Sequence, residues 1–326
     1  MKGISVIICC YNSALLLPET LRHLASQKIE PEIFWEVIIV DNLSLDETSV
    51  VSLKEWAKYE LANVKMRVVS EVNAGLSNAR KKGIEEAQFD YVLFCDDDNW
   101  LNNDYLQIAY NIIDGNKEIG AVGGQSEAVL ESGELPIWWQ ELQAGYAVGR
   151  QCKNSGNIAP HKFLWGAGMM ARKNLLKIIF DEQFPLLLSD RKGNELSSGG
   201  DVEICARILL LGSSLWYDDR LFFKHYMPRN RLTDEYRIRM FEGHKKSFLI
   251  LKKYFEIIDY TKWSLKKKLF ESVKNSVKLF LPFHQKNMDT DKVKTQLNSM
   301  WNLRFLQTGE VENEILRFKN QSKNRR

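Results

Sequence analysis

The sequence lacks several patterns that would place it in a special class of proteins. Its five cysteines include no C-x-x-C pair, so zinc ribbons, thioredoxin-like redox centres and disulfide scaffolds have no support. No uninterrupted apolar run reaches the roughly 18 residues needed to span a bilayer, which excludes a polytopic membrane protein. The 45 basic and 42 acidic residues nearly balance at +3, so we expect no nucleic-acid partner.

The remaining composition is that of an ordinary globular protein, with 44% hydrophobic and 27% charged residues among 326. A chain of this length allows two domains, or one large domain with an appendage, and needs no disulfide or structural metal for stability. The N-terminus enters an apolar run at once and shows no signal-peptide pattern. We therefore expect a reduced, cytoplasmic enzyme, with peripheral contact to the inner face of the plasma membrane as an option.

Short apolar runs alternate with amphipathic segments through the first 124 residues. The apolar runs predict strands at residues 4–9, 37–40, 66–70 and 91–95, and the amphipathic segments predict helices at 13–27 and 76–87. Such alternation is typical of an α/β fold with a doubly wound, mainly parallel sheet flanked by helices.

The pattern changes twice in the second half of the chain. Residues 125–160 show no clear period and predict a loop-rich insertion. Beyond it we expect short strands at 163–165, 215–217 and 221–224, and helices at 173–179 and 201–211. From Asp234 onward the chain is helical and basic. We therefore divide the chain into an α/β domain of residues 1–232, with halves 1–124 and 125–232, and a helical C-terminal extension of residues 233–326.

Polar residues follow three of the predicted strands where each one ends. Tyr11 and Asn12 follow the first strand, Asp41 and Asn42 the second, and the run Asp96-Asp97-Asp98 the fourth. In an open parallel sheet, ligands bind outside the carboxyl ends of the strands. Three adjacent carboxylates repel one another unless a cation or hydrogen-bond donors offset their charge, and oxygen ligands suit Mg²⁺ or Mn²⁺. The run predicts a divalent-metal site that also binds a diphosphate, with a solvated acidic turn as the alternative.

The stretch from Asn73 to Arg80 fits the same site. Gly75 lets the backbone approach a ligand closely, and Arg80 lies one turn into the following helix. From there its guanidinium can reach a nucleotide. A surface cation is the alternative for Arg80.

In order and spacing, residues 5–12, 40–42, 73–80 and 94–98 resemble the successive blocks of the family 2 glycosyltransferases. The resemblance implies the GT-A fold, a nucleotide-diphosphate sugar donor and transfer with inversion at the anomeric carbon. By position it implies that Tyr11 and Asp41 hold the nucleobase of the donor and that Arg80 holds the nucleotide. It places Asp96 near the ribose and a metal ion on Asp98, the last acid of the DXD motif. The implied donor-binding residues are Tyr11, Asn12, Asp41, Asn73, Gly75, Arg80, Asp96 and Asp97.

The resemblance continues in the second half, where three more segments match. Trp165, Gly166, Ala167 and Gly168 are similar to the family's loop between the donor and acceptor sites, and imply acceptor contacts. Residues 198–203 resemble the acidic motif that supplies the catalytic base. Many members have Glu-Asp there and this chain has Gly200-Asp201, so the base falls on Asp201, with Glu203 as an acceptor-side helper. His225 matches a second metal ligand of some GT-A enzymes, with a structural histidine as the alternative, and Arg229 and Arg231 are candidates for binding the leaving diphosphate.

Together these positions predict an inverting, metal-dependent hexosyltransferase with Mn²⁺ or Mg²⁺ as cofactor. It moves a sugar from a nucleotide-diphosphate sugar, with a UDP-sugar favoured, to a hydroxyl of a saccharide or lipid-linked acceptor. The family implies a role in bacterial cell-surface polysaccharide biosynthesis. Asp201 accepts the proton of the hydroxyl, and the metal on Asp98 offsets the charge of the leaving diphosphate. The Q-x-x-R-W signature of processive synthases is absent, which predicts single transfers.

Three alternative functions fit the sequence less well. A sugar-nucleotide pyrophosphorylase needs a glycine-rich, basic loop after the first strand, where this chain has residues 10–13, CYNS. A catalytically inactive sugar-binding module disagrees with the intact Asp98 and Asp201. Residues 166–171 formally match the dinucleotide fingerprint G-x-G-x-x-A, but no clear strand–helix–strand unit surrounds them, which argues against a dehydrogenase.

The basic stretch of residues 262–281 forms a separate feature. On a helical wheel an apolar side, formed by Leu265, Leu269, Phe270, Val273 and Val277, lies opposite Lys267, Lys274 and Lys278. Such a helix can lie on an anionic membrane as a peripheral contact. The alternative is that it packs on the catalytic domain and leaves a solvated basic face.

Overall fold

The structure is a computed structural model that describes residues 1–158, 161–188, 199–280, 289–301 and 308–322, with the side chains of 276–280 left out. Residue 198 of the acidic motif and residue 281 of the basic stretch therefore lie outside the described residues.

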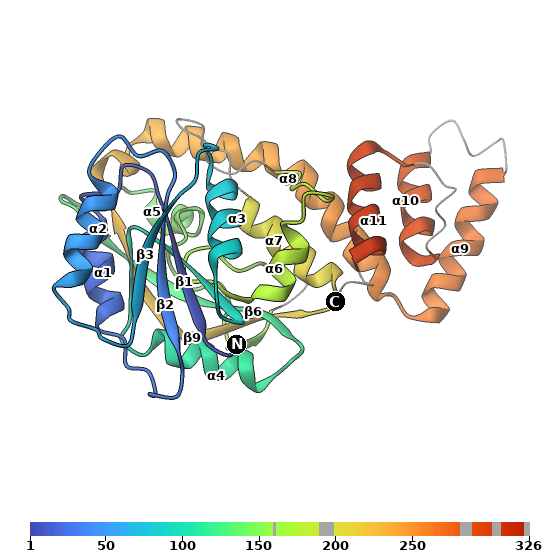
Figure 1. The fold of residues 1–326 in the computed structure, drawn as a ribbon. Helices are drawn as coiled ribbons and strands as arrows, with labels where there is room; N and C mark the ends of the chain where they lie inside the picture. Colours follow the sequence, from blue (N-terminus) through green and yellow to red (C-terminus); the bar gives the residue numbers. More distant parts are fainter. Residues whose placement is uncertain (159–160, 189–198, 281–288, 302–307, 323–326) are drawn as a thin grey trace.

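A mixed sheet of nine strands lies at the centre of the described part of the chain (Figure 1). Its order is β3-β2-β1-β4-β8-β6-β9-β5, and β7 pairs with β9. The first four strands, β1 to β4, pair in parallel, whereas β8 runs antiparallel to both β4 and β6. The strands are β1 Ile4–Cys10, β2 Trp35–Asp41, β3 Lys65–Ser70, β4 Tyr91–Asp96, β5 Asn99–Leu101, β6 Ile119–Leu130, β7 Gly156–Asn157, β8 Met170–Arg172 and β9 Ser214–Met227.

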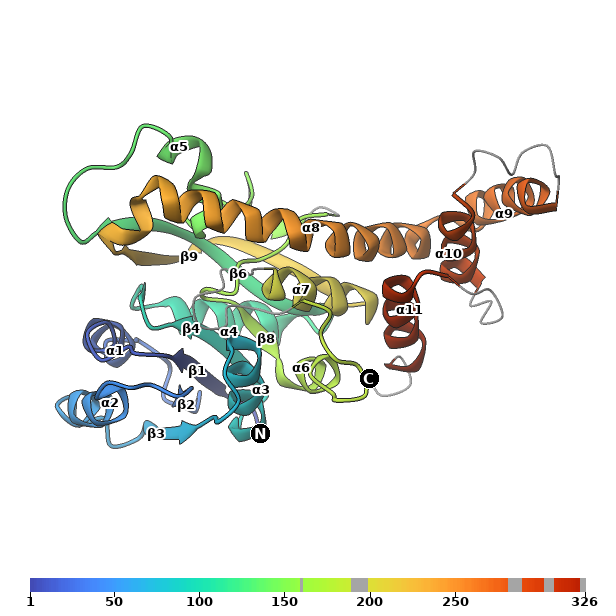
Figure 2. The same cartoon turned by 90° about the horizontal axis from the view of Figure 1, so that it is seen from above.

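Helices cover both faces of this sheet, and two short 3₁₀ turns, Gln143–Tyr146 and Arg229–Leu232, connect elements of the second half. The helices are α1 Leu17–Ala25, α2 Thr48–Ala57, α3 Leu76–Glu86, α4 Tyr105–Gly115, α5 Trp139–Leu142, α6 Lys173–Ile179, α7 Gly200–Leu210, α8 Asp234–Lys262, α9 Leu265–Phe280, α10 Thr290–Trp301 and α11 Glu310–Ser322. Figure 2 shows α1 and α2 on one side of β1 to β3 and α3 on the other.

The alternation of side chains along the buried strands explains the two helical layers. Val6 and Ile8 of β1 pack in one cluster with α1, α2 and α4, whereas Ile7 packs in the other cluster with α3, α6 and α7. Because both faces are covered, the strands read as continuous apolar runs, as parallel strands usually do. The predicted α/β fold with a mainly parallel sheet is confirmed.

The second half of the sheet is more regular than the sequence predicts. Strand β6 extends to Leu130, inside the stretch expected to be a loop, and β9 is one strand of 14 residues where two short strands were expected. A bulge between Tyr217 and Phe222 interrupts the pairing of β9 with β6, and it separates the two predicted strands. At Gly124 a Cβ would lie 1.6 Å from the carbonyl oxygen of Leu221, so only glycine allows this approach. Residues 163–165, also predicted as a strand, form none.

The C-terminal helices continue the core and then leave it. Thr233 caps α8 by accepting a hydrogen bond from the backbone N–H of Tyr236 at 3.2 Å. Tyr254 and Ile257 of α8 pack in the same cluster as α7, and so does Ile315 of α11. The predicted division at 232/233 stays a prediction, and it falls within a shared core. In Figures 1 and 2, α8 crosses the molecule and α9 and α10 lie beyond the sheet. No helix in the described ranges combines the length and the apolar composition needed to cross a membrane.

Candidate active site

The candidate site lies where β1, β2 and β4 end. The loop of residues 165–169 is fixed against the end of β4 by two backbone hydrogen bonds of 2.9 Å, from Gly168 N–H to Phe94 and from Phe94 N–H to Met169. Tyr105 adds a hydrogen bond of 2.7 Å from its hydroxyl to the carbonyl of Gly168. At φ +75° Gly168 adopts a left-handed conformation that favours glycine. This loop therefore brings the predicted acceptor segment next to the acidic run.

The first two strand ends are joined through their loops. The Asn12 side chain accepts a hydrogen bond from Leu45 N–H at 2.7 Å, and the Asn12 N–H donates to Ser44 Oγ at 3.0 Å. Asp41 accepts hydrogen bonds from the Ser44 N–H at 3.0 Å and from the Ser49 hydroxyl. Tyr11 remains 53% exposed beside them, which leaves its ring free to contact a ligand.

Asn42 organises the third donor-side loop, a role that the sequence reading did not give it. Its buried side chain donates to the carbonyls of Glu71 and Asn73, at 2.9 and 2.8 Å, and accepts from Gly75 N–H at 2.7 Å. Gly75 has φ +127°, a conformation that L side chains rarely adopt. The sequence signal for this role is that Asn42 directly follows Asp41 at the end of a strand.

Arg80, Gly166 and Asp201 meet at the centre of the site. The Gly166 N–H donates to Asp201 Oδ2 at 2.8 Å, and Arg80 Nη1 lies 3.6 Å from Asp201 Oδ1. Arg80 is buried, with its guanidinium carbon 5.3 Å from the centroid of the Phe94 ring, so it is not the surface cation of the alternative reading. The Asp201 side chain keeps 31% exposure. The carboxylate is therefore held in place and still accessible to solvent.

Asp98 lies in the turn between β4 and β5 and contacts two basic side chains from the other half of the chain. Its Oδ2 accepts a hydrogen bond from Arg231 Nη1 at 2.8 Å, and its Oδ1 lies 3.4 Å from His225 Nε2. The pairing of Asn99 with His225 in β5 and β9 sets this geometry. Burial alone would lower the pKa of Arg231, but the charge and hydrogen bond of Asp98, together with Tyr236 and Asp97, outweigh burial and raise that pKa.

The two neighbouring carboxyl groups, those of Asp96 and Asp97, have raised pKa values. Burial and the Asp98 carboxylate raise the pKa of Asp97 to about 7, although a hydrogen bond with Ser13 opposes the shift. Burial and Asp98 also raise the pKa of Asp96, against the opposing effects of Arg80 and His225. Negative charge is thus concentrated at this strand end, where a cation would stabilise it.

The donor set fits a Mg²⁺ or Mn²⁺ ion bound together with a diphosphate. Among the described residues no group of three or more His, Cys, Asp and Glu side chains is placed to hold a metal. However, these ions commonly take one or two protein groups and fill the remaining positions with water and phosphate oxygens. Asp98 and His225 provide such a pair. Within the described part of the chain, the buried His225 Nδ1 has no hydrogen-bond partner, so no described hydrogen bond on that nitrogen restrains the ring.

Two predicted site residues, Glu203 and Arg229, have side chains that do not contact the other site residues described above. Glu203 is fully buried and accepts hydrogen bonds from the N–H groups of Leu187 and Leu188, from Tyr254 and from Arg207. This placement contradicts the predicted contact of Glu203 with an acceptor and makes it a core residue. The reason is helical geometry, because residues two apart point to opposite sides of a helix.

Arg229 has an exposed side chain, and its backbone N–H donates to Glu131 Oε2 at 2.9 Å. It therefore differs from Arg231, whose side chain contacts Asp98. Trp165 is buried, and its N–H donates to Gln151 Oε1 at 2.9 Å.

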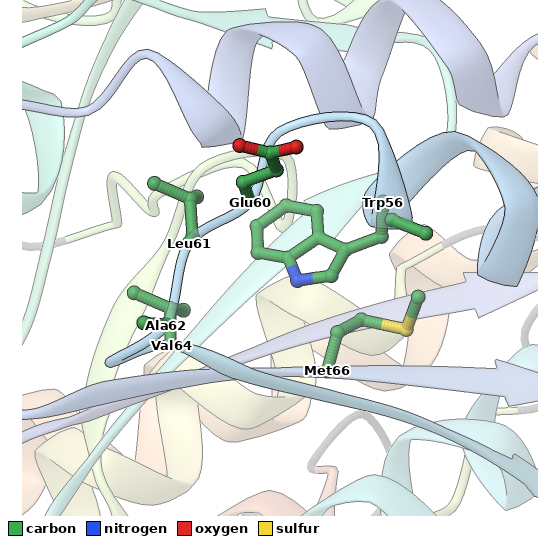
Figure 3. A pocket seen from close by; sticks show the side chains of 7 residues that line it. Trp56, Glu60, Leu61, Ala62, Val64 and Met66 are labelled. Carbon is green, nitrogen blue, oxygen red and sulfur yellow. The ribbon is translucent and has the colours of Figure 1, made fainter.

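Two hollows lie away from the site. One, of about 340 Å³, follows α2 and is lined by Trp56, Glu60, Leu61 and Met66, among others (Figure 3). The other, of about 380 Å³, lies between Lys2, Asp114 and Arg172, at the start of β1. Neither includes a residue of the candidate site.

In sequence, the chain matches one family model and several individual proteins. The family model described as Glycosyl transferase family 2 matches residues 5–175. The chain is similar to the cholesterol galactosyltransferase of Borreliella burgdorferi, at 33% identity over 108 residues, covering 33% of this chain and 28% of that protein. It is similar to the poly(ribitol-phosphate) beta-N-acetylglucosaminyltransferase TarS of Staphylococcus aureus, at 32% identity over 114 residues, covering 35% of this chain and 19% of that protein. These matches span less than a third of either relative.

Comparison with solved structures covers nearly the whole chain. S. aureus TarS 1-349 in complex with UDP-GlcNAc aligns with a TM-score of 0.54 and 18% identity, over 100% of this chain and 90% of that one. The mannosyltransferase PcManGT of Pyrobaculum calidifontis, in complex with GDP-Man and Mn²⁺, aligns with a TM-score of 0.53 and 16% identity, over 93% and 88%. At such identities the likeness shows the fold, which is the GT-A type predicted from the sequence.

Proposed function

We propose, on the premise that this chain belongs to glycosyl transferase family 2, that it transfers a sugar from a nucleotide-diphosphate sugar to an acceptor hydroxyl with inversion. The observation that carries the proposal is the position of Asp201. Its accessible carboxylate is held by Gly166 N–H and Arg80, and, in addition to burial, its charge helps to raise the pKa of Asp96 in the acidic run.

In this proposal Asp201 is the general base. It accepts the proton of the acceptor hydroxyl while that oxygen attacks the anomeric carbon of the donor and the bond to the diphosphate breaks. The Gly166 N–H and the Arg80 guanidinium fix the direction of the carboxylate. A single base and a direct displacement invert the anomeric centre.

The other residues of the site bind and orient the donor. Tyr11 and Asp41 bind the nucleobase, the Asn73–Gly75 loop organised by Asn42 approaches the nucleotide, and Asp96 lies near the ribose. Asp97 is a further donor-binding residue. Asp98 and His225 would hold Mg²⁺ or Mn²⁺, which offsets charge on the leaving diphosphate. Arg231, already in contact with Asp98, adds positive charge beside the same group.

We favour a UDP-sugar donor and a saccharide or lipid-linked acceptor in the synthesis of a bacterial surface polysaccharide, on the cytoplasmic side. The names of two relatives and the ligand of one similar structure support this choice. The S. aureus relative is named for poly(ribitol-phosphate) and the B. burgdorferi relative for cholesterol, and the TarS structure contains UDP-GlcNAc.

The donor can be found by a thermal-shift screen of UDP-, GDP-, CMP- and dTDP-sugars with Mn²⁺ or with EDTA. A ligand that binds the folded state raises the melting temperature, so the donor should do so and Mn²⁺ should enlarge the shift. Release of nucleoside diphosphate from that donor then reports turnover. If no nucleotide sugar stabilises the protein, or if turnover persists under full chelation, the metal-dependent transferase is wrong.

A further inference from the structure

Helix α9 packs with its polar side inward and its apolar side outward. Leu265, Leu269, Phe270 and Val273 are 64%, 52%, 68% and 66% exposed. At 100° per residue these four positions share one arc of the helix, which we call the apolar arc. A helix on a globular protein normally turns such an arc toward the core. In α9 the apolar arc instead faces solvent, which is the reverse of the usual orientation.

Polar contacts of residues outside the apolar arc, made with α10, fix this orientation. Asn275 is buried and donates from Nδ2 to Gln296 Oε1 of α10 at 2.7 Å. Trp301 Nε1, at the end of α10, donates to Ser272 Oγ at 2.5 Å. The apolar arc therefore faces away from α10, and Figure 1 shows α9 at the far end of the molecule from α1 and α2.

Positive charge surrounds the apolar arc. By helical position Lys266 lies within the arc, between Val273 and Phe270. Lys274 and Lys267 lie about 40° and 60° beyond Phe270, beside one edge of the arc rather than opposite to it as expected from the sequence. Lys267 Nζ lies 3.9 Å from the centroid of the Trp263 ring. Glu271 lies outside the arc, where it pairs with Lys274 at 3.3 Å. The outward side of residues 265–275 thus combines large apolar side chains with lysines.

We propose that α9 docks on the surface of an anionic lipid bilayer. The apolar arc enters the boundary between headgroups and acyl chains, and the lysines extend along their apolar stems to reach lipid phosphates. A second copy of this helix is a poorer occupant of the arc. Pairing two such arcs buries Lys266 of each copy against apolar side chains without a counter-charge.

Co-sedimentation of the full chain with vesicles tests the proposal. The vesicles contain equal parts of phosphatidylglycerol and phosphatidylcholine, or phosphatidylcholine alone. We expect binding to the anionic vesicles and at least about tenfold weaker binding to the neutral ones. The double variant Phe270→Ser/Val273→Ser should bind at least about tenfold less. The variant Lys266→Glu/Lys267→Glu should lose the preference for anionic lipid.

A matched control is available on α2, at the other end of the molecule in Figure 1. Val50 and Leu53 are 47% and 52% exposed, so the variant Val50→Ser/Leu53→Ser removes similar apolar surface and should bind vesicles like the unchanged protein. All replaced side chains are exposed, and circular dichroism melts should show that each variant is folded.

Two results would overturn the proposal. One is equal sedimentation of the unchanged protein and Phe270→Ser/Val273→Ser, or no sedimentation with anionic vesicles at all. The other is a change from dimer to monomer in sedimentation velocity for that variant, without vesicle binding, which would assign the arc to a second copy. Vesicle binding needs no nucleotide sugar, so donor-induced thermal shifts on the same variants keep this test separate from that of the proposed reaction.

Discussion

Arg231 Nη1 lies 2.8 Å from Asp98 Oδ2, so the turn after β9 supplies the counter-charge of an acid that follows β4. This contact joins the two halves of the α/β domain at the candidate metal site. It also places a guanidinium where Mg²⁺ or Mn²⁺ and a diphosphate are proposed to bind.

Replacing Arg231 with Ala should make the metal-free protein less stable, by about 1.5–3 kcal/mol, because a buried carboxylate loses a charged hydrogen bond. Added Mn²⁺ should restore more stability to this variant than to the unchanged protein, since the ion then takes over as counter-charge. Melting curves with Mn²⁺ and with EDTA measure both effects. Arg229→Ala is the comparison, with a smaller expected effect because the Arg229 side chain is exposed. Equal Mn²⁺ shifts in Arg231→Ala and the unchanged protein would show that arginine and metal do not share Asp98.

Replacing Asp201 with Asn should lower turnover by roughly 10²–10⁴-fold, because the amide cannot accept the proton of the acceptor hydroxyl. Donor binding, followed by thermal shift, should change little. Glu85→Gln is a suitable control, since this acid is exposed on α3 and lies 3.9 Å from Lys81. Near-normal turnover in Asp201→Asn would remove the carboxylate from its assigned role.

Replacing Gly166 with Ala should reduce turnover without unfolding the protein. The added Cβ would lie 2.5 Å from Arg80 Nη2 and 3.1 Å from Asp201 Oδ2, so both side chains must move. Arg80 can shift its flexible end, so we expect a loss of stability below about 2 kcal/mol. Gly115→Ala is the control, because nothing lies within 4 Å of its Cβ. Unchanged kinetics in Gly166→Ala would mean that the geometry of these three groups is not needed.

Replacing Tyr254 with Phe should lower stability by about 1–3 kcal/mol, because its hydroxyl donates to the buried Glu203 Oε1 at 2.6 Å. The KM for the acceptor should stay the same if Glu203 is a core residue. Urea unfolding and acceptor-dependent kinetics measure the two effects. A rise in acceptor KM with unchanged stability would return Glu203 to the acceptor site.

The donor half of the fold could be predicted from the sequence because its strands are buried on both faces. In the second half, the helices expected at 173–179 and 201–211 are also found, as α6 and α7. The long strands could not be predicted, because their regularity depends on pairs that a local pattern does not reveal. In β9, Asp218 pairs with Arg220 Nε at 2.8 Å within a bulge, so polar residues that look like a turn belong to a strand. Its partner β6 could not be recognised as a strand because it contains Gly124, a residue that usually indicates a loop. In the structure this glycine allows the backbone of β6 to approach Leu221 of β9 closely.

The candidate site divides in the same way. The strand-end residues Asp41 and Asp98 could be found because the ends of parallel strands meet at one edge. The role of Asn42 depends on three hydrogen bonds to a loop about thirty residues away, which no local pattern encodes. The resemblance of residues 198–203 to the family's acidic motif implies an acceptor-side role for Glu203, but its position on α7 directs its side chain into the core.

The 29 residues of α8 correspond to about 43 Å of helix. This helix begins three residues after Arg231 and ends three residues before α9 starts. Val202, next to Asp201, packs against Leu251 in the middle of α8. About eleven residues, or roughly 17 Å of helix, therefore lie between the level of Asp201 and the end of α8 at Lys262. If α9 docks on a bilayer as proposed, we expect the acceptor hydroxyl to belong to a glycan end that extends above the lipid, rather than to a sugar attached directly to a headgroup.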